Sequence, residues 1–154
     1  MTKFIATFAY VGLFPVAPGT AGSLVALPLA WVIITLTGPL GLLIAAAVAF
    51  AAGVWATGME TAGSHDHDPG EIVIDEVAGQ FLALFPLATG AAIWGSHLAT
   101  LCVGFFLFRL FDILKPWPVS WADNMNTPLG VMLDDVIAGI IAAAVLWILI
   151  VMMP

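Results

Sequence analysis

Three long stretches of the chain contain no charged residue, and they set the predicted architecture. They cover residues 4–59, 77–108 and 136–153. A membrane-spanning helix needs about 20 apolar residues, and in hydrocarbon its backbone polar groups must be satisfied internally. The pattern therefore predicts an all-α integral membrane bundle with about four to five short or interrupted membrane helices, in a single domain over residues 1–154.

A glycine and a proline mark a turn inside the first stretch. Gly38-Pro39 follows polar threonines and divides the stretch into predicted spans near residues 22–37 and 39–58. No small-residue cleavage site precedes the motif at Pro15–Ser23, so we expect no cleavable signal peptide.

The second stretch is too long for one straight span and too short for two full ones. Thr89-Gly90 and Gly95–His97 are candidate turns. We therefore expect a tight hairpin of short or tilted helices over residues 77–108. The last span is expected to begin near Asp134 and to run to the C-terminus.

Composition agrees with a membrane protein and excludes other classes. The chain is 62% hydrophobic and 8% charged, whereas an ordinary soluble chain is about 25% charged. Its net charge is -7 with three basic residues, which leaves no basic footprint for nucleic acid. The single cysteine, Cys102, excludes a disulfide framework and a cysteine-rich metal site.

Every acidic residue lies in one of two windows, Glu60–Glu76 and Arg109–Asp135. Several of these acids lie against or inside apolar runs, where a carboxylate is costly and is a functional candidate. They are Asp75, Glu76, Asp112, Asp134 and Asp135. The alternative is that the windows are simply polar loops.

Two predicted hairpins would place the N-terminal segment and both acidic windows on one membrane face. A single span over residues 77–108 would instead separate the windows, and they could not build one site. Lys3, Arg109 and Lys115 would also lie on the common face. The positive-inside rule then indicates the cytoplasmic side.

The two acid pairs occur in similar surroundings. Residues 70–79 and 130–139 each begin with glycine, contain apolar residues and adjacent acids, and end in Ala-Gly. Small residues one turn after the acids allow close helix packing. The structural alternative is that both pairs are first-turn charges that complement a helix dipole.

The acid pairs and Asp112 together form an oxygen-rich set, which suits Mg²⁺ or Mn²⁺. The neighbouring string His65-Asp66-His67-Asp68 is better interpreted as a solvated loop. Asp66 and Asp68 also mimic an aspartyl-phosphate motif, but that chemistry expects a hydrophobic strand before the first Asp. Gly63-Ser64-His65 precedes it here, so we reject that interpretation.

Arg109, Asp112 and Lys115 are spaced so that they share part of a helix face, before Pro116 and Pro118 end the helix. The two cations could hold a phosphate. The alternative is that they anchor the helix at the membrane edge.

The segment Pro15–Ser23 precedes a predicted helix and offers flexible backbone N–H groups and hydroxyls. This arrangement is a candidate anion cradle, although it lacks the lysine of a P-loop. The alternative is an ordinary helix start with Ser23 as the N-cap.

Four motifs occur in the order found in one enzyme family, and together they cover about residues 10–140. The motifs are residues 15–24, 68–79, 108–118 and 130–139. On these motifs the chain resembles the phosphatidylglycerophosphatase A family. One departure is visible, because Thr127-Pro128 stands where the family often has a glycine pair.

The resemblance implies a bacterial, Mg²⁺-dependent membrane phosphatase of phospholipid biosynthesis, with Mn²⁺ as a possible substitute. It implies hydrolysis of phosphatidylglycerophosphate to phosphatidylglycerol and phosphate. The expected location is the bacterial inner (cytoplasmic) membrane, with the active site facing the cytoplasm. The lipid substrate and the bilayer are the expected partners, and no oligomeric state follows.

Roles can then be carried onto residues as a hypothesis. Five acids are expected to hold one or two Mg²⁺ ions, and a sixth, Asp68, to assist as ligand or general base. The five are Asp75, Glu76, Asp112, Asp134 and Asp135. Arg109 and Lys115 are expected to clamp the phosphate, while Thr20, Gly22 and Ser23 bind phosphate or headgroup. No covalent phosphoenzyme is expected.

Three other functions remain open at this point. A divalent-cation transporter would distribute its acids through the membrane depth, whereas these acids are predicted on one face. A lipid phosphotransferase would need a nucleotide-bearing substrate, for which the chain has no dedicated motif. A purely structural membrane protein would leave the paired acids unexplained.

Overall fold

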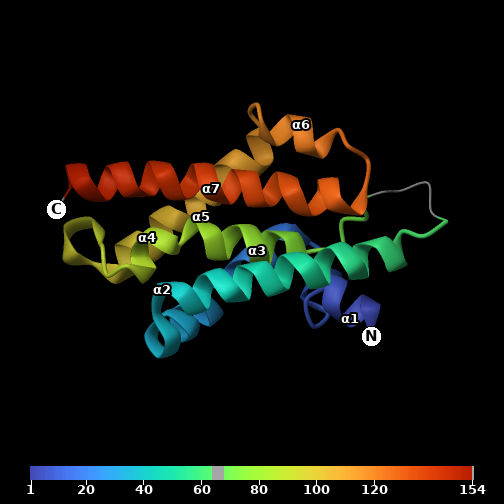
Figure 1. Ribbon diagram of the computed structural model, residues 1–154, viewed down its shortest axis with the longest axis horizontal. Helices are drawn as coiled ribbons and strands as arrows, with labels where there is room; N and C mark the ends of the chain where they lie inside the picture. Colours follow the sequence, from blue (N-terminus) through green and yellow to red (C-terminus); the bar gives the residue numbers. More distant parts are fainter. Residues whose placement is uncertain (64–67, 154) are drawn as a thin grey trace.

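The computed structural model describes residues 1–63 and 68–153, and within them every regular element is a helix (Figure 1). The longer helices run roughly parallel or antiparallel to one another. The elements are α1 (Thr2–Ala6), η1 (Val11–Leu13), α2 (Pro18–Glu60), α3 (Ile74–Ala83), α4 (Phe85–Ala88), η2 (Ile93–Gly95), α5 (His97–Leu114), α6 (Val119–Asp123) and α7 (Pro128–Met152). The all-α prediction is confirmed.

Three helices are long and apolar enough to cross a membrane: α2, α5 and α7. They expose many large apolar side chains; Leu36, for example, is 78% exposed. Such surfaces suit contact with lipid rather than water. The chain is therefore an integral membrane helical bundle.

Helix α2 is two helices joined at Gly38, whose φ of 67° and ψ of -161° break the helical path. Leu29 of the first half and Val48 of the second line one groove, so the halves lie side by side. The predicted division is confirmed. The first half, however, begins at Pro18, because proline suits the first turn of a helix.

That early start makes the interpretation of Ser23 as an N-cap wrong. Ser23 lies inside the helix, and its hydroxyl donates to the carbonyl oxygen of Gly19 at 3.0 Å. The N-cap position belongs to Ala17.

The hairpin predicted over residues 77–108 is confirmed. α3 and α4 lead toward the end of the bundle where the C-terminus lies, and α5 returns from it (Figure 1). Gly90 has a φ of 86° at the turn. Ser96 caps α5 by accepting from the backbone N–H of Ala99 at 3.2 Å.

The predicted start of the last span near Asp134 is wrong, since α7 begins at Pro128. Thr127 caps it by accepting from the backbone N–H of Gly130 at 3.1 Å. Asp134 and Asp135 therefore lie beyond the first turn, and the helix-dipole interpretation fails for this pair. It fits Asp75 and Glu76, which lie in the first turn of α3.

Helix α3 lies between α2 and α7 (Figure 1). Close packing after each acid pair is confirmed: a Cβ atom at Gly79 would lie 2.6 Å from the backbone oxygen of Asp135. The contact brings the acidic first turn of α3 beside the acids of α7.

Candidate active site

A cavity of about 370 Å³ lies where the start of α2, the start of α3, the end of α5 and the early turns of α7 meet. Both acidic windows and the segment before α2 contribute to it, as the hairpin topology predicts. Its charged lining residues are Asp68, Asp75, Glu76, Arg109, Asp112, Lys115, Asp134 and Asp135. The cavity is therefore strongly acidic.

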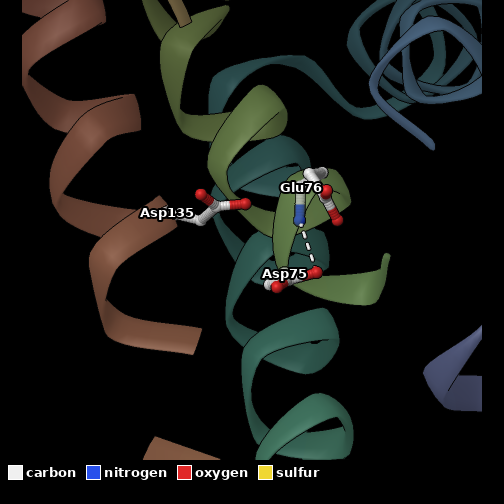
Figure 2. A group of neighbouring side chains, drawn as sticks. All are labelled: Asp75, Glu76 and Asp135. Atoms are coloured by element: carbon white, nitrogen blue, oxygen red, sulfur yellow. Dashed lines mark hydrogen bonds between the residues drawn. The ribbon is translucent and has the colours of Figure 1, made fainter. Parts of the chain in front are cut away.

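Three carboxylates converge in this cavity. One oxygen each of Asp75, Glu76 and Asp135 lies within 4.8 Å of the others (Figure 2). Asp75 and Asp135 are 7% and 3% exposed. The backbone N–H of Glu76 donates to Asp75 Oδ1 at 3.0 Å, which fixes the two acids relative to each other.

This triad fits a bound divalent cation. Buried carboxylates repel one another and lose solvation, so they need a compensating positive charge. Glu76 Oε2 is buried and has no hydrogen-bond partner among the described residues. Several carboxylate oxygens with unused acceptor capacity are a donor set that Mg²⁺ and other hard cations prefer.

Asp112 and Asp134 line the same cavity but stand outside the triad. Each is paired with a cation instead: Asp112 Oδ2 lies 2.6 Å from Arg109 Nη1, and Asp134 Oδ2 lies 2.7 Å from Lys115 Nζ. The structure thus brings three of the five predicted metal ligands together. Metal binding by the other two stays a prediction.

Arg109 links three helices. Besides Asp112 on its own helix, its Nη1 lies 3.8 Å from Glu76 Oε1 of α3 and donates to Ser23 Oγ of α2 at 3.4 Å. Its side chain is 15% exposed. All three contacts are made by Nη1, and the buried Nε has no hydrogen-bond partner among the described residues.

Comparison with known families identifies the family of this chain. A model of phosphatidylglycerophosphatase A matches residues 4–150. The chain belongs to the phosphatidylglycerophosphatase A family. Membership makes it a phosphatase, a hydrolase of phosphoric monoesters, which favours that class over the transporter, phosphotransferase and structural alternatives.

Individual relatives agree over most of the chain. Phosphatidylglycerophosphatase A of Escherichia coli (strain K12) is 36% identical over 144 residues, which are 88% of this chain and 76% of the relative. The protein of the same name from Haemophilus influenzae is 37% identical over 137 residues, 88% and 80% of the two chains. A relative from Bacteroides thetaiotaomicron, 35% identical over 134 residues, is named for phosphatidylinositol-3-phosphatase activity. No solved structure matches.

In this member of the family, Lys115 follows α5 rather than belonging to it. The helix ends at Leu114 and Lys115 adopts a left-handed conformation, so the prediction that it shares the helix face of Arg109 is wrong. Its Nζ binds Asp134 and Asp123. Burial alone would lower the pKa of Lys115, but the hydrogen bonds to the two acids outweigh it and raise that pKa.

The predicted phosphate-binding residues before and within α2 separate into two groups. Thr20 lines the cavity, as does Asp68 from the other acidic window. Gly22 lies behind it, where a Cβ atom would be 2.9 Å from Val73 Cβ, and Ser23 is fully buried. His65, Asp66 and His67 lie outside the described residues.

Sequence reasoning did not single out Gly19 as a site residue. A Cβ atom there would lie 2.0 Å from Glu76 Oε1 and 3.4 Å from Arg109 Nη1. A side chain at this position would therefore force the Glu76 carboxylate to move. One sequence feature could have marked it: Gly19 directly follows Pro18 in the first turn of α2, and this turn lines the charged cavity.

Proposed function

We propose that this chain hydrolyses phosphatidylglycerophosphate to phosphatidylglycerol and phosphate with the help of Mg²⁺. The reaction would serve phospholipid biosynthesis at the cytoplasmic face of the bacterial inner membrane. The observation that carries the proposal is the triad of buried Asp75, partly buried Glu76 and buried Asp135 in a cavity that also contains Arg109. The names of the two relatives that share 36% and 37% identity support this substrate.

Charge balance supports the need for metal. Six acids line the cavity and two basic residues, Arg109 and Lys115, accompany them. A phosphate monoester carries further negative charge, so two basic side chains do not neutralise the assembly. Mg²⁺ held by the triad would offset part of the remaining negative charge, and Mn²⁺ would satisfy the same ligands.

When bound, the ion supplies Lewis-acid stabilisation and lowers the pKa of a bound water. Arg109 binds the phosphoryl oxygens through its planar fork, and Lys115 adds a compact charge beside it. Asp112 and Asp134, which pair with these two cations, would be the carboxylates that hold a second ion. Ser23 keeps Arg109 oriented from behind, packed beside Gly22.

The hydrolysis proceeds in one displacement. A water oxygen bonds to phosphorus while the bond from phosphorus to the glycerol oxygen breaks. Asp68 accepts the proton of the attacking water and releases it to solvent, and the departing glycerol oxygen takes up a proton from solvent. Thr20 contributes its hydroxyl to the headgroup. No residue becomes phosphorylated.

The direct test is phosphate release from phosphatidylglycerophosphate by purified protein in detergent, with Mg²⁺ and with EDTA. Asp75→Asn and Asp135→Asn should each lower kcat by about a hundredfold or more, because each removes one charge from the triad. Glu60→Gln is the matched control, since Glu60 does not line the described cavity. Folded wild-type protein that releases no phosphate, or that is indifferent to EDTA, would contradict the proposal.

Phosphatidylinositol 3-phosphate is the comparison substrate, because one relative is named for its hydrolysis. We expect a higher kcat/KM for phosphatidylglycerophosphate. A higher kcat/KM for phosphatidylinositol 3-phosphate would support phosphatase activity but contradict the proposed substrate.

A further inference from the structure

An apolar groove runs between the first half of α2 and α5. Its volume is about 580 Å³, and its apolar lining comes equally from the two helices: Leu27, Pro28, Trp31, Leu98, Leu101 and Cys102. His97 lies beside Trp31, with ring centroids 5.5 Å apart, near the turn before α5. The groove therefore lies on the part of this helix pair away from the acids.

The same two helices line the charged cavity. The first turn of α2, with Thr20, and the last turns of α5, with Ile113, both face it. From Thr20 to Pro28 is about 12 Å along a helix, and from Ile113 to Cys102 is about 16 Å. The line along which α2 and α5 lie together, here called the seam, thus leads from the cavity to the groove over about 15 Å. This length is half of the roughly 30 Å hydrocarbon core, which is the depth that the acyl chains of one leaflet cover.

Ile113 marks where this seam leaves the cavity. Two large apolar side chains line the described cavity, Ile72 and Ile113, and their exposures are 4% and 67%. Phe106 and Leu110, which precede Ile113 along one face of α5, are 69% and 47% exposed. The cavity therefore opens onto an apolar surface of α5 on this side.

A lipid phosphomonoester needs such a junction. Its phosphate must enter the charged cavity, while moving its chains into water is unfavourable for every CH₂ group that leaves the bilayer. The surface between the two environments must consequently be apolar. Neither apolar groove shares a described lining residue with the cavity. A second groove, of about 410 Å³, lies between α1, α2 and α3 and contains no described residue of α5, the helix whose exposed apolar face leads to Ile113.

We propose that the groove between α2 and α5 binds an acyl chain of the lipid substrate, with Ile113 at its entrance as a specificity-determining residue. The inference rests on the proposed phosphatase function. It assigns the preference for long-chain lipid to one seam of the bundle. Catalysis on the phosphate itself stays with the charged cavity.

The test compares substrates of different chain length. Cys102→Trp fills the groove, so kcat/KM should fall about tenfold for phosphatidylglycerophosphate with 16-carbon chains. It should stay unchanged for the six-carbon analogue, whose chains end before residue 102. Val48→Trp is the matched control, because Val48 is 62% exposed in the second apolar groove.

Two further variants keep the result interpretable. Cys102→Phe gives a smaller obstruction in case the tryptophan lowers the Tm, and Ile113→Ser should lower activity on the long-chain lipid at unchanged Tm. A long-chain to short-chain ratio that is unaffected in all three variants, or that changes in Val48→Trp instead, would overturn the inference. Wild-type protein that hydrolyses neither lipid would overturn the proposed function itself.

Discussion

Gly139 of α7 lies directly against the backbone of Gly79 in α3. A Cβ atom at Gly139 would be 2.3 Å from the carbonyl oxygen of Gly79 and 3.0 Å from its Cα. Each glycine follows its acid pair by about one turn, in the two helices that supply the triad. The separation of these backbones therefore sets how closely Asp135 approaches Asp75 and Glu76.

Gly139→Ala is expected to push α7 from α3. We expect it to lower the free energy of unfolding by about 1–3 kcal/mol, because the obstacle is backbone and cannot rotate away. Phosphatase activity should fall as well, since the triad opens. Thermal unfolding in detergent and phosphate release measure the two effects.

Gly58→Ala is the control for this substitution. A Cβ atom at Gly58 would meet Pro128 Cγ at 3.6 Å, an ordinary contact. Alanine should stabilise this helix interior by about 0.5–1 kcal/mol. Equal behaviour of the two variants would show that the α3–α7 contact has no special role.

The N-terminal segment contacts the residues that lead into the triad. A Cβ atom at Gly12 would lie 1.9 Å from the backbone oxygen of Glu71, and the Val73 N–H donates to the Ala6 carbonyl oxygen at 2.9 Å. Gly12→Ala should therefore displace the residues leading into Asp75. We expect a severalfold higher Mg²⁺ concentration for half-maximal activity. An unchanged Mg²⁺ requirement in a folded variant would contradict this.

Arg109→Lys keeps the charge but loses the planar guanidinium, whose Nη1 contacts Glu76, Asp112 and Ser23. We expect kcat/KM to fall by about a hundredfold, because an ammonium group cannot bind two phosphoryl oxygens as the planar fork does. Lys3→Met is the control: its pair with Glu71 is about half exposed, and such pairs contribute little. Activity of Arg109→Lys near that of wild type would exclude a clamp at this residue.

The raised pKa of Lys115 leads us to expect a particular pH dependence of stability. Its folded pKa is raised above the ordinary value of 10.5. The stabilisation from its charge is therefore complete below that value and is lost as pH rises through the folded pKa. The Tm difference between wild type and Lys115→Met should stay constant from about pH 8 to about pH 10 and shrink above. A difference that disappears near neutral pH would contradict this assignment.

The hairpins were predictable because local features define them. Gly38-Pro39 breaks the first charge-free stretch, and Gly90 turns the second. The charge pattern predicts the start of α7 near Asp134, whereas Thr127 caps the helix and Pro128 is its first residue. Local capping chemistry decided this boundary.

The site was predictable in its members and not in its pairing. The apolar surroundings of the acids marked them, but the pattern could not tell which carboxylates would meet. Asp112 pairs with Arg109 three residues earlier on the same helix, as their spacing allows, whereas Asp134 pairs with Lys115 across elements that tertiary packing brings together. The need for glycine at residue 19 depends on Glu76, more than fifty residues away.

The triad joins residues from the middle of the chain to one in its last helix, and this has a consequence for biosynthesis. During translation α3 emerges long before α7, so a ribosome-bound chain that has not reached Asp135 carries two of the three carboxylates. The third arrives only when the final helix enters the bilayer and docks at Gly79. With the triad as the proposed catalytic centre, activity is expected only from copies whose membrane insertion is complete, and an interrupted nascent chain is expected to be inactive.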